Sequence, residues 1–277
     1  MTTLAPNLAR RTELTAFLRS RRARITPAEV GIAAGIRRRT PGLRREEVAL
    51  LAGVSVTWYT WLEQGREINA SAQVLDAVAR ALRLDAAERA HLYELVGPGK
   101  ATSPTELPPT ADTLAVLDAL EPTPACVYDA KFDLLACNAT YRALFPELAR
   151  AAGPERNVLW QLLAGRRDGG PFGNHQLLPR MVAMLRAGYV RHLGDPDWLD
   201  FIDRLSVAST DFAVLWADHQ VAEPLPEVTS FHRPPVGTIE MRPASFAATP
   251  ESQLVVYLPV GASDVRKLAD IRRHGLD

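Results

Sequence analysis

The stretch REEVALLAGVSVTWYTWLEQGR, residues 45–66, decides the fold of the first third of the chain. Its apolar residues recur at helical spacing on either side of Gly53-Val54, which predicts two short helices joined by a tight turn. Glycine accepts the positive φ that such a turn needs. Ser55 can cap the second helix, and Gly65 is placed to end it. We therefore expect the second helix to present its capped end at the surface.

Further helices are expected on both sides of this pair. Helical spacing predicts an all-α, five-helix domain over residues 1–97, with helices at about 11–24, 44–52, 56–64, 72–82 and 86–96. Residues 98–110 are rich in Gly, Pro, Ser and Thr, a composition typical of an interdomain linker.

The rest of the chain, residues 111–277, is expected to form a second domain of mixed structure. The predicted elements are a helix at 111–120, strands at 125–128 and 132–137, a helical stretch interrupted near 165–173, strands at 228–232, 237–242 and 254–258, and a last helix at 263–272. The fold class is therefore α+β, with a PAS-like antiparallel sheet and helices over one face. Such an arrangement can enclose an apolar cavity.

Charge is unevenly divided along a chain whose formal net charge is zero. Residues 1–100 carry 16 Lys plus Arg against 10 Asp plus Glu, a formal charge of +6, and the remainder carries −6. A basic half joined to an acidic half indicates that the first half faces a polyanion.

Several classes of protein are excluded by composition. No run of ~18 consecutive apolar residues supports a membrane span. The first residues lack the apolar core and cleavage site of a secretory signal. The two cysteines, Cys126 and Cys137, are too few for a disulfide scaffold and fit a reducing cytoplasm. We therefore expect a cytoplasmic protein without a membrane partner.

Two resemblances follow from these residues. Gly53-Val54-Ser55 and Glu63-Gln64-Gly65-Arg66 resemble the turn and the helix end of the XRE (Cro/C1-type) helix-turn-helix family, over about residues 11–96. The whole chain resembles the MmyB-like regulators of that family, on the stretches at 37–66, 71–97, 122–145, 155–157, 212–216 and 254–259. The resemblance implies a DNA-binding transcription regulator, located on the nucleoid, with a PAS-like ligand-binding domain. Fatty-acid-like ligands have been suggested for that domain.

The resemblance also implies which residues face DNA. The expected DNA-binding residues are Arg45, Ser55, Val56, Thr57, Thr60, Trp61 and Arg66. Val56 and the methyl group of Thr57 can contact thymine methyl groups, and the Thr57 hydroxyl can donate or accept a hydrogen bond. Arg45 and Arg66 flank the helix and are the expected phosphate contacts. Since one helix reads few bases, we expect a homodimer on double-stranded DNA.

Arg37, Arg38 and Arg39 form a basic run in a long connection between the first two helices. They are predicted to touch the DNA backbone or minor groove, and the alternative is a solvated charge run. For Glu63 we expect a bracing role, through an ion pair with Arg21 or Arg22.

The expected ligand-binding residues of the second domain are Arg156, Asn157, Trp160, Phe212 and Trp216. Arg156 and Asn157 match an Arg-Asn pair of the family and could hold a carboxylate, whereas the aromatic residues could line a cavity. The alternative is that Asn157 caps a helix, that Arg156 lies at the surface and that the aromatic residues are plain core. The segment at 166–175 departs from the family pattern.

No enzyme is indicated. The sequence has no zinc-binding motif, no complete phosphate-binding loop and no nucleophile elbow, so we expect neither catalysis nor a metal or cofactor. The expected function is a sequence-specific transcription regulator whose second domain senses a small apolar or fatty-acid-like effector. The alternative is a regulator whose second domain binds a protein partner such as a sigma factor; a closed apolar cavity would favour the sensor and an exposed groove the partner.

Overall fold

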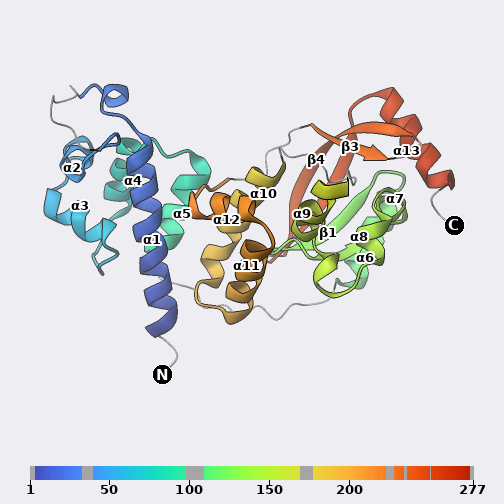
Figure 1. Cartoon of the computed structure of the whole chain (residues 1–277), viewed down its shortest axis with the longest axis horizontal. Coiled ribbons are helices and arrows are strands. Elements are labelled where there is room, and N and C mark those ends of the chain that lie inside the picture. Colours follow the sequence, from blue (N-terminus) through green and yellow to red (C-terminus); the bar gives the residue numbers. More distant parts are fainter. Residues whose placement is uncertain are drawn as a thin grey trace. The chain divides into compact units, whose positions relative to one another are not determined.

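The structure is a computed structural model that describes residues 4–32, 40–97, 109–168, 177–222, 228–233, 236–249 and 251–274. Its contacts divide the chain into two compact units. The first, here called the helical unit, comprises Met1–Thr102, Arg186–Arg204 and Ala213–Glu223. The second, here called the sheet unit, comprises Ser103–Leu185, Leu205–Phe212 and Pro224–Asp277. Both units therefore contain discontinuous parts of the chain, and Figure 1 labels their elements.

The helical unit contains the five predicted helices. They are α1 (Leu4–Arg24), α2 (Arg45–Ala52), α3 (Val56–Glu63), α4 (Ala72–Ala81) and α5 (Ala86–Val96), with a 3₁₀ turn η1 (Ala28–Val30). The first helix begins at Leu4, earlier than predicted. Pro6 lies in its first turn, where the missing N–H leaves no intrahelical bond unmade. The α2–α3 pair follows the prediction within a residue at each end.

Local chemistry fixes the turn between α2 and α3. Gly53 adopts a φ of +67°, and its N–H donates to the carbonyl oxygen of Leu50 at 3.2 Å. The Ser55 side chain then accepts a hydrogen bond from the backbone N–H of Trp58 at 3.1 Å, which caps α3. Both predicted roles are confirmed. Tyr59 and Leu62 are buried, so α3 is held against the core by one face and presents the other outward.

The chain after α3 passes close to α1. Gly65 has a φ of +64°, and a Cβ atom added there would lie 2.6 Å from the carbonyl oxygen of Arg11. Arg11 in turn donates from Nε to the carbonyl oxygen of Gly65 at 2.5 Å. Glycine is therefore required both by the backbone conformation and by the approach of the first helix.

Residues from far along the chain complete the helical unit. They belong to a 3₁₀ turn η3 (Val190–His192), to most of α11 (Pro196–Ala208) and to most of α12 (Thr210–Ala217). Within this unit η3 contacts α5. The predicted domain limits, 1–97 and 111–277 with a linker at 98–110, stay a prediction, and residues 98–108 lie outside the described part of the chain.

The sheet unit is built on a five-stranded antiparallel sheet in the order β2-β1-β5-β4-β3. The strands are β1 (Ala125–Asp129), β2 (Leu134–Cys137), β3 (Thr229–Arg233), β4 (Gly237–Thr249) and β5 (Ser252–Pro259). The predicted α+β fold class is confirmed, whereas its PAS-like character stays a prediction. β4 extends beyond the predicted residue 242, because residues 243–249 continue to pair with β5.

Helices accompany this sheet. They are α6 (Ala111–Ala119), α7 (Ala139–Leu144), α8 (Pro146–Arg150), α9 (Val158–Asp168), α10 (Leu177–Tyr189) and α13 (Ala262–His274), with a 3₁₀ turn η2 (Gly153–Arg156). One sheet face carries Ala125, Val127 and Val256, which pack with Leu117 of α6 into an apolar cluster. Side chains alternate along each strand, so Cys126, Tyr128 and Tyr257 belong to the opposite face.

No described helix is both long enough and apolar enough to cross a membrane.

Candidate functional site

Helix α3 carries four of the residues predicted to read DNA. Val56 and Trp61 expose 47% and 41% of their surface, and Thr57 is exposed as well. Thr60 is half-buried. Positions separated by one turn lie on the same side of a helix, so these side chains form one accessible face. The structure therefore brings four of the predicted DNA-binding residues together on one helix.

A buried carboxylate braces this helix from behind. Glu63, the last residue of α3, has no exposed surface. It accepts hydrogen bonds from Arg22 of α1 at 2.7 and 3.0 Å and from Arg45 of α2 at 2.9 Å. Burial alone would raise the pKa of Glu63, but the hydrogen bond from Arg22 and the charges of Arg22 and Arg45 hold it below its ordinary value. The predicted bracing of Glu63 is confirmed with Arg22, whereas Arg21 pairs elsewhere.

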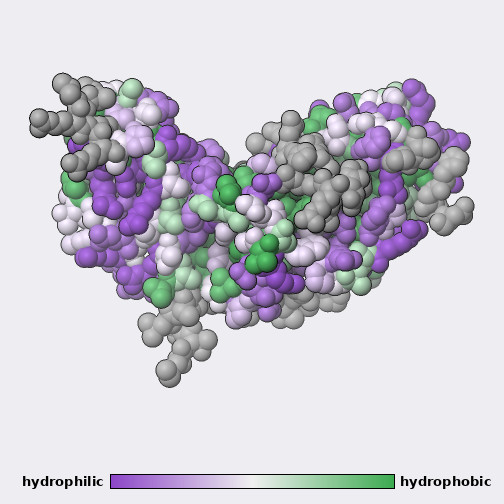
Figure 2. All heavy atoms as spheres, viewed as in Figure 1, coloured by the Kyte–Doolittle hydropathy of each residue, from purple (hydrophilic) through white to green (hydrophobic). Residues whose placement is uncertain are grey.

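The two predicted phosphate contacts differ in their surroundings. Arg45 is half-buried because its Nε is committed to Glu63. Arg66 is exposed, and its guanidinium carbon lies 5.9 Å from the centre of the Trp61 ring. On the face drawn in Figure 2, hydrophilic residues cover most of the surface of helices α1 to α5. Arg37, Arg38 and Arg39 lie outside the described residues.

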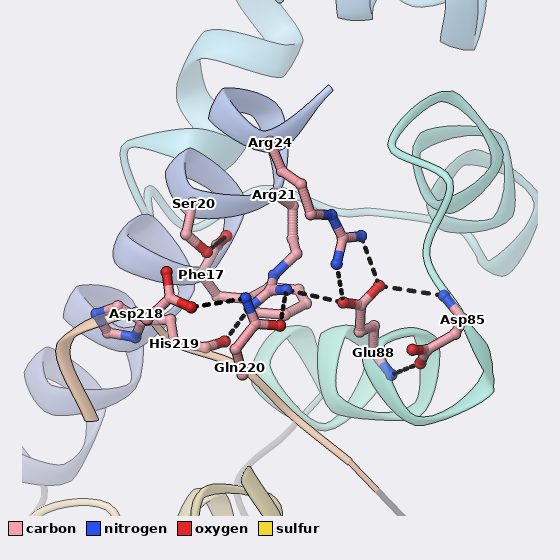
Figure 3. A network of polar contacts seen from close by, with 9 residues as sticks. All are labelled: Phe17, Ser20, Arg21, Arg24, Asp85, Glu88, Asp218, His219 and Gln220. Carbon is pink, nitrogen blue, oxygen red and sulfur yellow. Dashed lines mark hydrogen bonds and ion pairs between the residues drawn. The ribbon is translucent and has the colours of Figure 1, made fainter. Parts of the chain in front are cut away.

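Elsewhere in the helical unit, Arg21 of α1 joins three parts of the chain (Figure 3). Its guanidinium is 1% exposed and donates to Glu88 of α5 at 2.8 Å. It also donates to Gln220 at 3.0 Å and to the carbonyl oxygen of His219. Arg24 donates to Glu88 at 2.6 and 3.0 Å. Burial alone would raise the pKa of Glu88, but the hydrogen bond from Arg24 and the charges of Arg21 and Arg24 hold it below its ordinary value.

A second buried ion pair lies in the same unit. Arg186, the first α10 residue that belongs to the helical unit, is 1% exposed and donates to Glu13 of α1 and to the carbonyl oxygen of Trp216. Its guanidinium carbon lies 3.9 Å from the centre of the Trp216 ring. His219 lies 3.2 Å from the same Glu13 carboxylate. Burial would raise the pKa of Glu13, but the hydrogen bond from His219 and the charge of Arg186 lower it to about 2.

These contacts were missed by reasoning from the sequence. Glu13 and Arg186 lie 173 positions apart, and neither belongs to a motif. The available signal was weak: an acidic residue in an otherwise basic first helix, and an arginine on an otherwise apolar turn of α10.

The sheet unit contains an apolar cavity of about 110 Å³. Helix α10 contributes Leu177, Arg180, Met181 and Met184, which share one helix face. The strands and the other segments contribute Tyr128, Phe132, Val158, Thr229, Phe231, Pro243, Ser245, Gln253, Val255 and Tyr257. Arg180 is the one charged residue among these described lining residues. The cavity therefore offers apolar walls and a single cation.

Hydroxyl groups lie beside this cavity. The phenol of Tyr128 is hydrogen-bonded to that of Tyr141 and lies 3.4 Å from that of Tyr257. All three rings are buried, and burial raises the pKa of each phenol above its ordinary value. They are therefore neutral hydrogen-bonding groups at any physiological pH.

None of the five residues predicted to bind a ligand is among those that line the cavity. Asn157 has no exposed surface; its side chain caps α9 through the N–H of Trp160 at 3.1 Å and donates to Asp133 at 2.7 Å. Arg156 donates to the carbonyl oxygen of Leu134 at 2.7 Å. Phe212 is buried in the sheet unit, and Trp216 belongs to the helical unit. The five residues are divided between the two units.

Sequence comparison gives two family matches. A helix-turn-helix domain model matches residues 13–92. A model described as the MmyB-like transcription regulator ligand binding domain matches residues 109–269, more than half of the chain. No curated protein matches the chain significantly.

Proposed function

Because the chain belongs to the MmyB-like transcription regulators, we propose that it binds a specific DNA sequence through α3 and responds to a fatty-acid-like effector held in the α10 cavity. The family is one of regulators with a helix-turn-helix domain and a ligand-binding domain. The class of effector, the residues that hold it and the way it acts are the proposal.

The observation that carries the effector class is the composition of the cavity wall. Its residues are almost all apolar or neutral, and the one charged side chain among the described lining residues is Arg180. An apolar chain would lie along Met181, Met184 and Val255, and a carboxylate would pair with the guanidinium. A carboxylate can form a charge-assisted hydrogen bond with a guanidinium and a neutral apolar ligand cannot, so an acid would gain more from this site.

The cavity must widen to admit a long chain. It measures about 110 Å³, and a cavity of roughly 150 Å³ is filled by a ligand as small as benzene. Met181 and Met184 line the α10 side and are half-buried. Methionine is unbranched and flexible, so these two side chains can change rotamer at low cost and open the site.

The effector is tested with the full-length chain by calorimetry and thermal unfolding. Saturated fatty acids of increasing length should bind and raise the melting temperature, and their methyl esters should bind at least 10-fold more weakly. Arg180→Leu should remove the difference between acid and ester, whereas Arg204→Leu, which changes an arginine outside the cavity, should preserve it. Equal binding of acid and ester to the unchanged protein would refute the carboxylate site.

Native mass spectrometry of the chain purified from cells gives an independent test. A small molecule that is released on denaturation would support the sensor. A bound protein with no small molecule would favour the alternative of a protein partner for the second domain.

For DNA, the exposed face of α3 supports readout by Val56 and Thr57. Thr57→Ala should change the preferred base at its contact, while Arg66→Ala should weaken binding to all sequences and lower the salt dependence. Arg45 is a poorer probe of phosphate contact, because its removal also takes a partner from buried Glu63. Selection of binding sites from random DNA with each variant distinguishes these effects.

A homodimer would contact twice as many base pairs as a single α3 helix, and its DNA site would be an inverted repeat. Sedimentation analysis with and without the selected DNA checks this. A single chain bound to a single half-site at saturation would contradict it.

Helix α10 supplies a route from effector to DNA. Its residues Leu177, Arg180, Met181 and Met184 line the cavity, and Arg186, on the following turn, is buried against Glu13 of α1. A change in α10 on effector binding would alter this ion pair, and α1 also braces α3 through Arg22 and Glu63. Glu13→Gln should reduce the effect of the fatty acid on DNA affinity while leaving fatty-acid affinity within a factor of two. An undiminished effect would exclude this route.

A further inference from the structure

The two cysteines of the chain lie opposite each other in the sheet. Cys126 of β1 is the register partner of Cys137 of β2 in the antiparallel pair. Residues directly opposite in such a pair project from the same face. Both thiols are free in this structure. They are separated by eleven positions of sequence, and the sequence alone gave no reason to pair them.

The hydrogen bonds around the pair fix its type. The N–H of Asn138 donates to the carbonyl oxygen of Ala125 at 3.0 Å, so these neighbours form the hydrogen-bonded pair. On the other side, the N–H of Tyr257 donates to the carbonyl oxygen of Pro124 at 2.9 Å, which directs the polar backbone groups of Cys126 toward β5. Hydrogen-bonded and non-hydrogen-bonded pairs alternate along an antiparallel ladder. Cys126 and Cys137 therefore form a non-hydrogen-bonded pair.

Such a pair has the spacing of a disulfide. The Cα atoms of a non-hydrogen-bonded pair lie about 4.5 Å apart, with the side chains drawn together. Disulfides span Cα separations of about 4.4–6.8 Å. A bond between these two sulfur atoms would therefore need side-chain rotation and only small adjustment of the strands.

From this placement we propose that Cys126 and Cys137 form a reversible intrachain disulfide when the protein meets a peroxide. Cys137 is half-buried and reacts first: its sulfur attacks one peroxide oxygen, which yields a sulfenic acid and releases water. The sulfur of Cys126 then attacks the Cys137 sulfur. The sulfenic oxygen leaves and takes the Cys126 proton, so a second water is released and the peroxide has been reduced by two electrons.

The surroundings set the order of reaction. Cys126 is fully buried, and burial raises the pKa of its thiol well above the ordinary value. Burial also raises the pKa of Cys137, but the positive charges of Arg142 and Arg156 oppose that rise. The thiolate is the reactive form, so Cys137 is the site of attack on the oxidant and Cys126 the resolving thiol. Arg156, predicted from the sequence as a ligand contact, here opposes the rise in the pKa of Cys137 through its positive charge.

The bond would lie beside the apolar cavity. Cys126 and Tyr128 share a face of β1, and Tyr128 lines the cavity. The disulfide would link β1 covalently to β2, next to a wall of the proposed effector site.

The full-length protein tests this directly. After treatment with hydrogen peroxide and then denaturation, the wild type should show no thiol reactive to maleimide and a monomer mass lower by two hydrogen atoms. Dithiothreitol should restore both thiols. Cys126→Ala, checked for folding by thermal unfolding, should instead accumulate a sulfenic acid that dimedone traps, and Cys137→Ser should show no dimedone adduct.

Two results would overturn the proposal. One is a wild type that retains both maleimide-reactive thiols after peroxide treatment, whether or not Cys126→Ala forms the dimedone adduct. The other is a disulfide found only between two chains on a non-reducing gel.

Discussion

His91 lies buried on α5 against the ring of Phe17, whose centre is 5.0 Å away. Neither ring nitrogen of His91 has a hydrogen-bond partner among the described residues. Burial lowers its pKa to about 4, with the charges of Arg186, Arg21 and His219 adding to the shift and that of Glu13 opposing it. The imidazole is therefore neutral in the folded protein and costly to protonate.

This environment predicts an acid-sensitive contribution to stability. The unfolded chain takes up a proton near the ordinary pKa of 6.5, whereas the folded chain does so only near 4. Stability is thus retained above pH 6.5 and is lost as the pH falls toward 4, by about 2 kcal/mol at pH 5. His91→Phe should remove that part of the loss in urea titrations at pH 5 and pH 8. The pH 8 value reports any change in packing, and an unaltered pH dependence would contradict the assignment.

Gly65 and Gly53 form a matched pair for a second prediction. Both have a positive φ, but a Cβ at Gly65 would meet the carbonyl oxygen of Arg11 at 2.6 Å, whereas a Cβ at Gly53 would meet nothing within 4 Å. Gly53→Ala should cost about 1–2 kcal/mol from backbone strain alone. Gly65→Ala should cost clearly more, because α1 must also move. Denaturant unfolding gives the free energy of unfolding of each variant. Equal losses would show that α1 moves away from the added Cβ at position 65 without cost.

At the scale of the element, the caps of α3 and α4 are chemically alike. Ser55 accepts from Trp58 N–H at 3.1 Å, and Ser71 accepts from Val74 N–H at 3.4 Å. Each serine to alanine change should lower the free energy of unfolding by about 1 kcal/mol. Only Ser55→Ala should also weaken binding to selected DNA, since it loosens the first turn of the reading helix. Fluorescence anisotropy measures the DNA affinity of each variant. Equal losses of affinity in the two variants would show that the cap of α3 matters no more for DNA binding than the cap of α4.

The sequence predicted the elements best where the signal is local. Gly53, Ser55 and Gly65 act on neighbouring backbone groups, so the limits of α2 and α3 followed from them. Asn138 is a further local case, because its side chain caps α7 by accepting a hydrogen bond from the N–H of Tyr141 at 2.9 Å. The full length of β4 was missed, because its second half is specified by pairing with β5 rather than by its own alternation.

At the scale of the molecule, the order of the two family domains and the α+β class followed from sequence patterns. The sequence did not indicate the cavity, because α10 and four strands, β1, β3, β4 and β5, meet there from separate stretches of chain. Nor did it give the partners of Glu13 and Arg21, since charged residues far apart carry no periodic signal. The ligand-binding residues were predicted partly from the Arg156-Asn157 pair. In the structure Asn157 caps α9.

The composition of the helical unit predicts how a short fragment behaves. A fragment of residues 1–97 keeps Glu13 and Arg21 but lacks Arg186, His219 and Gln220. Leaving a buried charge without its partner costs about 3–5 kcal/mol. The fragment should therefore unfold at lower urea concentration than the same helices in the full chain, as monitored by Trp61 fluorescence. Equal midpoints would show that the distant residues add nothing to these helices.

A different consequence of this discontinuous unit concerns a chain that is cut. A protease that cleaves once between residues 98 and 108 would break one peptide bond and no described contact of the helical unit, which draws on chain from both sides of the cut. The two pieces should then stay associated without a covalent link. Such a nicked protein would behave as a split pair whose halves complement each other, and its reassembly after separation would report on the strength of the buried arginine contacts.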